Sequence, residues 1–274
     1  MYMRYSMTVS INWEEIWERN IQDIASRTTV DYWESRAEDY SDMVLNSAFH
    51  HGEQIRQFCF SEGLADSESQ VIDIGSGPGA LTIPFARNVQ SVTAIEPAAQ
   101  MIQKLEENAK GENLKNIYPL QKTWQEVNTR QFEKSFDLVL CCHSLWHFPD
   151  IMVQLKRMDM VSRGYCCIAG GFGTSEDSAY LYKTLRIREM EFDQFHCLFN
   201  LLNSKGMRPN VTVLPYETHR SERSAISSME QVVQKYRPLT SKDTEIIRDY
   251  VKSRLKDGIV SSNGLMGLLW WRVA

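Results

Sequence analysis

The chain has 274 residues, of which 43% are hydrophobic and 24% charged, the composition of an ordinary globular protein. Its 14 Gly and 8 Pro exclude collagen-like and Gly/Pro-rich disordered chains, and its net charge of −5 gives no electrostatic reason to bind nucleic acid or an anionic membrane. At roughly 150 residues per domain, the length suits one large domain or a domain with an appendage.

The cysteines and the N-terminus indicate a cytoplasmic protein. Four of the six cysteines form two adjacent pairs, Cys141–Cys142 and Cys166–Cys167, inside apolar runs, which is not the spacing of a secreted disulfide scaffold. The first 15 residues lack the apolar stretch of a signal peptide, and no apolar run approaches the roughly 20 residues of a membrane helix. We therefore expect a reduced, cytoplasmic chain with no membrane partner and no nucleic-acid partner.

Three helices are expected ahead of the first strand. Apolar residues recur at helical spacing from Trp13 to Ile24, and Asn12 and Glu15 are placed like a capping pair. Two further helices are predicted over 31–45 and 49–62.

From residue 70 the pattern changes to alternating strands and helices. Short apolar runs, typical of buried strands, occur at 70–74, 91–95, 116–120, 136–142 and 164–169. Helical patterns lie between them at 80–88, 98–110 and 150–162. This alternation predicts an α/β fold with a doubly wound, Rossmann-like sheet and right-handed crossovers, in which ligands bind at the carboxyl ends of the strands.

The C-terminal part has a different pattern. A helix ends at Gly206, and strands are expected at 210–214 and 265–273, with two helices between them. An antiparallel final pair would complete a seven-stranded sheet, with a helical insert before the last strand. Within a single domain over 1–274 we expect an N-terminal helical lid over 1–63, a cofactor-binding core over 70–171, and substrate-side helices and a cap over 172–260.

One glycine-rich segment carries the chemistry. The stretch VIDIGSGPGALTIPFA places Asp73, Gly75, Gly77 and Gly79 at the end of the first strand, opening into a helix. Glycines at alternate positions let a ligand approach the backbone, and free N–H groups at a helix start favour a carboxylate or phosphate. The spacing G-x-G-x-G does not fit the dinucleotide pattern G-x-G-x-x-G.

This segment resembles motif I of the class I S-adenosylmethionine-dependent methyltransferases, and the likeness is greatest to small-molecule enzymes of the methyltransferase type 11 kind. The resemblance continues through VTAIEP, which ends the second strand at Glu96, and through FDLVLCCHSLWHFPD, which follows the family's fourth strand and the turn after it. It covers about 31–171.

The resemblance implies a cofactor, S-adenosylmethionine, and a set of residues that hold it. The loop Asp73, Gly75, Ser76, Gly77 and Gly79 would hold the methionine part, and Glu96 would accept hydrogen bonds from the ribose hydroxyls. The adenosine and the methyl-bearing region would be bordered by Tyr40, Pro97, Met101, Trp124 and Cys142. Trp124 suits core packing equally well, and Tyr40 suits packing better than cofactor contact. The family commonly has an acid just before the tryptophan, where this chain has Lys122 and Thr123.

The segment after the fourth strand limits the classes of methyl acceptor to be expected. It lacks the Pro-Pro-aromatic motif of amino-group DNA methyltransferases and the paired glutamates of protein arginine methyltransferases, and no cysteine follows a proline as in cytosine-C5 enzymes. A small-molecule acceptor is therefore expected, with protein methylation as the alternative and with the acceptor atom, the pathway and the oligomeric state left open. His143 and His147 are the candidate catalytic bases, each with an alternative structural role.

Two alternatives and one expected absence complete the analysis. A catalytically silent cofactor-binding sensor or scaffold would bind S-adenosylmethionine without forming S-adenosylhomocysteine, and a nicotinamide oxidoreductase would bind NAD(H) instead. The paired cysteines and nearby histidines suggest a zinc or metalloid site, but no CxxC or HExxH spacing occurs, so no metal site is expected.

Overall fold

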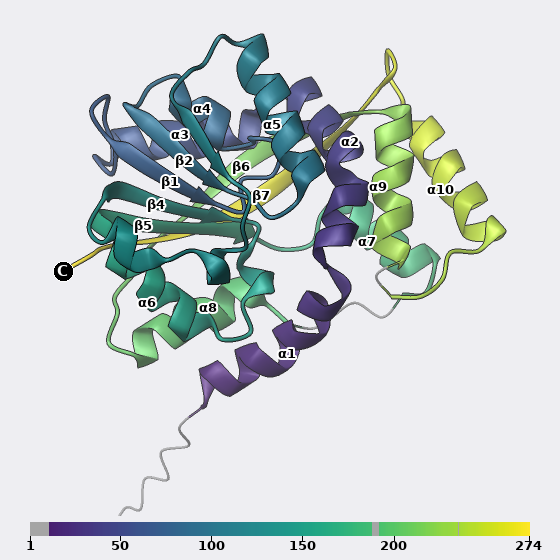
Figure 1. Cartoon of the computed structure of the whole chain (residues 1–274). Helices are drawn as coiled ribbons and strands as arrows, with labels where there is room; N and C mark the ends of the chain where they lie inside the picture. The colour runs from purple at the N-terminus through teal and green to yellow at the C-terminus, as the bar shows by residue number, and fades with distance from the viewer. Residues whose placement is uncertain (1–10, 188–191, 235) are drawn as a thin grey trace, which may run out of the picture.

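The computed structural model describes residues 11–187, 192–234 and 236–274 and contains one seven-stranded sheet with helices on both faces (Figure 1). The strands are β1 (Gln70–Ile74), β2 (Ser91–Ile95), β3 (Ile117–Leu120), β4 (Phe136–Cys142), β5 (Ser162–Gly171), β6 (Asn210–Ser221) and β7 (Ile259–Arg272). Their order is β3-β2-β1-β4-β5-β7-β6, and β7 is antiparallel to both of its neighbours. The predicted fold class is confirmed, and β1, β2 and β4 have the bounds expected from the sequence.

The central strands are buried on both faces, which explains their continuous apolar sequences. In β4, six of seven residues are buried. Val139 and Cys141 join the apolar core on one face of the sheet, whereas Leu138 and Leu140 join the core on the other face. Successive side chains of a strand point to opposite faces, so one short run contributes to two cores.

The helices divide between the two faces of the sheet (Figure 1). The core on one face includes residues of α1 (Trp13–Arg27), α6 (Ile151–Val161) and α8 (Gln194–Ser204), and that on the other includes residues of α3 (His50–Ser61), α4 (Thr82–Ala86) and α5 (Ala99–Gly111). The N-terminal helices are confirmed, including the Asn12 cap, whose side chain accepts from the Glu15 amide. The helix expected over 80–88 is shorter, because the chain is still in the turn at Gly79, where φ is +96°.

The two C-terminal strands are longer than expected. Strand β6 was predicted over 210–214 but continues to Ser221, and its pairing with β7 runs from Asn210 opposite Trp270 to Ser221 opposite Ile259. Pro215 is tolerated because β6 is an edge strand. The additional residues carry β6 to the carboxyl edge of β1 and β4, where the site lies.

A separate apolar cluster lies beyond this edge of the sheet (Figure 1). It joins α7 (Glu176–Thr184), which the sequence did not predict, to α9 (Glu222–Gln234) and α10 (Ser241–Arg254), the insert between β6 and β7. The remaining N-terminal helix, α2 (Val30–Asn46), packs against α5, β6 and α9. Within the described ranges, no helix combines the length and apolarity needed to cross a membrane.

Candidate functional site

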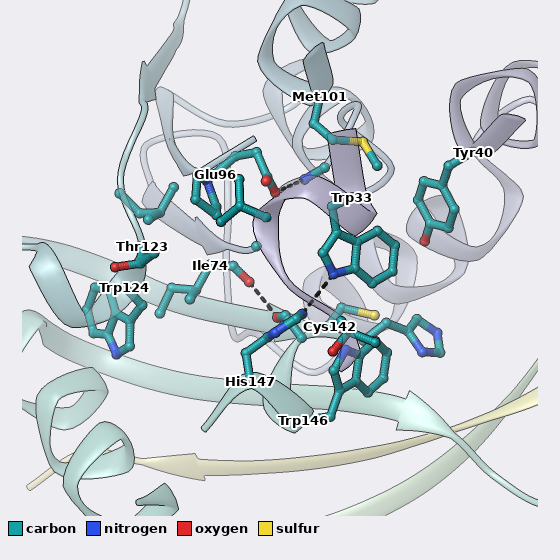
Figure 2. Close-up of a pocket in the computed structure, with 18 of the residues that line it drawn as sticks. Trp33, Tyr40, Ile74, Glu96, Met101, Thr123, Trp124, Cys142, Trp146 and His147 are labelled. Atoms are coloured by element: carbon teal, nitrogen blue, oxygen red, sulfur yellow. Dashed lines mark hydrogen bonds between the residues drawn. The ribbon is translucent and has the colours of Figure 1, made fainter. Parts of the chain in front are cut away.

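A cavity of about 500 Å³ lies at the carboxyl edge of β1, β2 and β4, where helix α2 and strand β6 also reach it (Figure 2). This is the position at which ligands bind in doubly wound sheets. Ten of the predicted site residues line it: Tyr40, Gly75, Gly77, Glu96, Pro97, Met101, Trp124, Cys142, His143 and His147. Asp73, at the end of β1, and Ser76 and Gly79, in the loop that follows, do not line the cavity.

Each glycine of the loop after β1 is needed for a different local reason. All three have positive φ, +76° at Gly75, +53° at Gly77 and +96° at Gly79. A Cβ on Gly75 would lie 2.6 Å from Cβ of Ser144, and one on Gly79 would lie 2.6 Å from Cδ1 of Leu105. A Cβ on Gly77 would have no neighbour closer than 3.8 Å, so this backbone faces open cavity, and a ligand can approach it closely.

Two polar residues support the loop from behind. The Asp73 carboxylate is buried and accepts a hydrogen bond from Thr82 Oγ1 at 2.6 Å, which ties the end of β1 to the start of α4. Burial raises the pKa of Asp73 to about 6. The Ser76 hydroxyl is buried and has no hydrogen-bond partner among the described residues, which leaves a polar group available beside the loop.

Glu96 ends the second strand with its carboxylate against the glycine loop. It accepts hydrogen bonds from the Gly77 amide at 3.0 Å and from the Ala98 amide at 2.9 Å. Burial raises its pKa to about 7, although both hydrogen bonds favour the ionised form. A carboxylate offers about four lone-pair sites, so it can accept further hydrogen bonds from a bound ligand.

Trp124 both packs in the core and lines the cavity. It opens a short 3₁₀ turn (Trp124–Glu126) after β3, and its side chain is 2% exposed. The Arg157 guanidinium lies 5.3 Å from the centre of the indole ring and donates to the Trp124 carbonyl at 2.7 Å. The indole N–H has no hydrogen-bond partner in the described part of the chain. The sequence left open whether Trp124 packs in the core or contacts the adenine, and its position is compatible with both roles.

Two neutral histidines meet on the wall beyond β4. His143 follows Cys142 with a φ of +53°, and its ring centre lies 6.2 Å from that of His51, on α3. Burial lowers the pKa of His143 to about 4 and that of His51 to about 3, so both are uncharged near neutral pH. Neither imidazole makes a hydrogen bond to another side chain within the described ranges. His51 was not identified from the sequence, because one histidine on a helix gives no signal of what it faces.

His147 is attached to the helix that covers the cavity. Its Nε2 accepts a hydrogen bond from the indole nitrogen of Trp33, on α2, at 3.0 Å (Figure 2). The Trp33 ring also packs edge-on against Tyr40, with 6.2 Å between ring centres. Tyr40 Cε1 is the atom nearest to the Cβ position of Gly77, and burial raises the pKa of its hydroxyl. Helix α2 is therefore fixed over the glycine loop.

Strand β6 contributes lining residues that the sequence did not reveal. Tyr216, Thr218 and Arg220 line the cavity, as expected for alternate positions of one strand. His219, which lies between two of these positions, is not a lining residue; its Nδ1 lies 2.8 Å from Ser261 Oγ. The predicted strand ended at Leu214, so the sequence did not predict which way the side chains of Tyr216, Thr218 and Arg220 would point.

The cysteines pack as apolar residues. In the pairing of β4 with β5, Cys141 lies opposite Ile168 and Cys142 opposite Ala169, so the two cysteine pairs are out of register. All six cysteines are buried and free of disulfides. No group of three or more metal-ligating side chains occurs over 11–187, 192–234 and 236–274.

Comparison with known proteins connects this geometry to a family. Residues 71–163 match the family described as Methyltransferase domain. A segment of 85 residues, 31% of this chain, is 31% identical to a ubiquinone biosynthesis O-methyltransferase of Rickettsia akari. Another of 73 residues, 26% of this chain, is 37% identical to a 23S rRNA (uracil(1939)-C(5))-methyltransferase of Cronobacter sakazakii. The chain spans 32% and 17% of the lengths of these relatives.

Solved structures show the fold over most of the chain. A SAM-dependent methyltransferase of Aquifex aeolicus has a TM-score of 0.52 and 13% identity, covering 88% of this chain and 98% of that one. A candidate methyltransferase of Bacillus halodurans has a TM-score of 0.53 and 16% identity, covering 79% and 97%. The chain has the fold of these methyltransferases, and residues 71–163 match the methyltransferase-domain family.

Proposed function

We propose that this chain, a methyltransferase by its fold and its central domain, transfers a methyl group from S-adenosylmethionine to a small-molecule acceptor and releases S-adenosylhomocysteine. The observation that carries the proposal is the cavity at the carboxyl edge of β1 and β2, where the open backbone of Gly77 meets the Glu96 carboxylate. Six buried, free cysteines support the expectation of a reducing, cytoplasmic setting.

The residues present suit this cofactor. The Gly75–Gly77 backbone, with the unpaired Ser76 hydroxyl beside it, would hold the methionine part, and the free lone pairs of Glu96 would accept the ribose hydroxyls. Pro97, Met101 and the Trp124 indole would border the adenosine. The cavity of about 500 Å³ lies within the usual range for small-ligand sites, roughly 300–1,000 Å³.

The protein's contribution to the reaction is mainly orientation. S-adenosylmethionine supplies a methyl group on a sulfonium, an electrophile that needs no further activation. The walls of the cavity would hold the acceptor atom in line with the methyl–sulfur bond and exclude water. Positioning of this kind can lower the activation barrier by several kcal/mol, on the order of 7–11 in the best cases. Tyr40 and Cys142, which line the cavity between the glycine loop and β6, would border the transfer region.

His143 is our candidate for removing a proton from the acceptor. Its imidazole is neutral and makes no hydrogen bond to a described side chain, so it can accept a proton. His147 is the second candidate, but its Nε2 already accepts from Trp33, so acting as a base at that atom would require this bond to open.

A small acceptor suits the covered form of the cavity. Helix α2 lies over the glycine loop, held by the bond between Trp33 and His147, and His51 on α3 with Tyr216 on β6 lines the inner wall. One relative is an O-methyltransferase of ubiquinone biosynthesis and the other an rRNA methyltransferase. The net charge of −5 favours the small-molecule class over a nucleic acid.

The test is a calorimetric titration of the purified chain with S-adenosylmethionine, S-adenosylhomocysteine and, as a control, NAD. Micromolar binding of the first two without NAD binding is the expected result. Failure of a folded sample to bind either would contradict the proposal. Formation of S-adenosylhomocysteine in the presence of any acceptor would then exclude a catalytically silent cofactor-binding protein.

A further inference from the structure

One cation in the cavity wall has no anionic partner in the described part of the chain. Arg220 lines the cavity from β6 and makes one long hydrogen bond, from a guanidinium nitrogen to Ser224 Oγ at 3.4 Å. No carboxylate of the described residues forms an ion pair with it within 4.0 Å. A guanidinium has five N–H donors, so most of its hydrogen-bonding capacity is unused.

The carboxylates around Arg220 are bound by other donors. Asp39 accepts from Arg36 in a buried, two-pronged pair, with nitrogen–oxygen distances of 2.9–3.2 Å. Asp42 accepts from the amide and the hydroxyl of Ser221, at 3.1 and 3.0 Å. Asp177 accepts from Arg254 at 2.7 Å. Each acid is therefore engaged by another donor, and none forms an ion pair with Arg220, although Asp39 and Asp177 act on it at longer range in the direction that favours its charged form.

An uncompensated guanidinium in a cavity wall is unfavourable in the absence of ligand. Burial, together with the nearby charge of Arg36, lowers the pKa of Arg220, in the direction that disfavours its charged form, and the more distant Asp39 and Asp177 offset this only in part. Charged side chains taken out of water are normally paired, because desolvation is otherwise uncompensated. An anion that entered the cavity would supply the missing partner, and the planar guanidinium matches a carboxylate in a two-pronged pair.

Strand order places Arg220 far from the adenosine end of the cavity. The proposed cofactor residues follow β1, β2 and β3, whereas β6 is the opposite edge strand, four positions from β1. At about 4.8 Å between neighbouring strands, this is a separation on the order of 19 Å between the strand axes. Lys122, the other cation of the lining, lies beside Trp124 at the adenosine end. Among the described lining residues, Arg220 is therefore the arginine or lysine on the β6 side of the cavity, where its charge also acts on Tyr40, the side chain beside Gly77.

We propose that Arg220 binds a carboxylate of the methyl acceptor, so that the substrate is a small carboxylic acid held between Arg220 and the paired rings of His51 and His143. This inference rests on the proposed function. The methionine carboxylate of the cofactor has the same chemistry and is the other possible source of the anion, and the experiment below separates the two.

The experiment compares the wild-type chain with Arg220→Gln and with Arg223→Gln, a control three residues along whose side chain is 76% exposed and pairs with Glu38. Circular dichroism and thermal melting establish that each variant is folded. Calorimetry measures the affinity of each for S-adenosylhomocysteine and for methylthioadenosine, which lacks the amino-acid carboxylate. Ligand-observed NMR on each S-adenosylhomocysteine complex then measures binding of benzoate, 4-hydroxybenzoate, indole-3-acetate and hexanoate, each beside its carboxamide.

We expect wild type and Arg223→Gln to bind at least one acid tenfold or more tightly than its amide. Arg220→Gln should lose this preference. The affinity of Arg220→Gln for S-adenosylhomocysteine should differ from that of wild type by less than twofold. If Arg220→Gln instead weakens S-adenosylhomocysteine by tenfold or more but not methylthioadenosine, Arg220 binds the cofactor carboxylate and the acceptor assignment is overturned. If Arg220→Gln leaves the affinity for S-adenosylhomocysteine unchanged and wild type prefers no acid to its amide, Arg220 binds neither the cofactor carboxylate nor an acceptor carboxylate, and the proposal is overturned. If wild type binds no S-adenosylhomocysteine, the proposed function fails, and the acid–amide comparison on the free chain still tests Arg220.

Discussion

The two ends of the cavity are built from very different stretches of chain. The cofactor end uses residues close together in sequence, from Asp73 to Met101, around one strand–loop–helix unit and the strand that follows it. The proposed acceptor end brings His51, from an N-terminal helix, beside Tyr216 and Arg220 from an edge strand. A local motif therefore specifies the first end, whereas the second exists only once distant elements pack. Variants should affect the two ends separately, and the following predictions test that separation.

The largest effect is expected from Gly77→Asp. The new side chain would enter the open cavity, at a φ of +53° that L-residues rarely adopt, and would place a second carboxylate beside Glu96. We expect the affinity for S-adenosylhomocysteine to fall on the order of 100-fold or more, because a buried, unpaired charge costs several kcal/mol. Gly206→Asp is the matched control, since Gly206 has a φ of +80° and does not line the cavity. Unchanged binding by folded Gly77→Asp would refute the assignment of the loop.

Glu96→Ala should weaken binding less. The substitution removes the acceptor for the ribose hydroxyls and leaves the Gly77 and Ala98 amides without their partner. Losing hydrogen bonds to a charged group costs roughly 1–3 kcal/mol, or about 5- to 150-fold in dissociation constant. Calorimetry with S-adenosylhomocysteine measures this change. Binding of acids relative to amides at the acceptor end should remain, and its loss would show that the two ends are coupled.

Lowering the pH should weaken cofactor binding by a smaller factor, because protonation also removes the Glu96 carboxylate as an acceptor. Because the pKa of Glu96 is raised to about 7, its acceptor carboxylate is lost by protonation as the pH falls below 7. About half of the group is ionised at pH 7 and about a tenth at pH 6, so cofactor affinity should fall by at most about fivefold over this interval. In Glu96→Gln the affinity should be weaker and almost independent of pH over this interval. A wild-type affinity that rose on acidification would contradict the role given to the carboxylate.

The smallest effect is expected from Trp33→Phe. This change keeps an aromatic ring under α2 but removes the hydrogen bond to His147 Nε2, worth about 1 kcal/mol in a typical case. Faster amide hydrogen exchange in α2 and a few-fold loss of cofactor affinity should follow, because α2 covers the glycine loop. Trp270→Phe serves as control, since Trp270 is outside the cavity lining and packs against Phe58. Equal exchange rates in both variants would mean that the bond does not hold α2 in place.

The division of the chain into a lid over 1–63, a core over 70–171 and a cap over 172–260 stays a prediction. The cavity lining includes residues of all three segments, such as Trp33, Glu96 and Arg220. The separate apolar cluster of α7, α9 and α10 is consistent with a cap that has its own packing. Whether these segments move relative to one another is a question that hydrogen exchange with and without S-adenosylhomocysteine would answer.

The sequence by itself determined the α/β class, the bounds of β1, β2 and β4, and the glycine loop at the proposed cofactor end of the cavity. These features depend on short-range rules: apolar runs form buried strands, and the alternate glycines between Asp73 and Gly79 reflect a tight loop whose geometry is set within a few residues. Most of the ten predicted site residues that line the cavity were implied by the resemblance to the methyltransferase family rather than by these short-range rules.

Only the tertiary structure decided the acceptor end. The extension of β6 to Ser221 depends on pairing with β7, whose partner residues lie about 40–60 positions away in sequence, and this pairing gives Arg220 its direction. The neutral state of His51 and His143 and the unpaired state of Arg220 follow from burial among elements that the chain brings together from distant positions. Burial and partnership are properties of packing, so residue type and spacing could not reveal them.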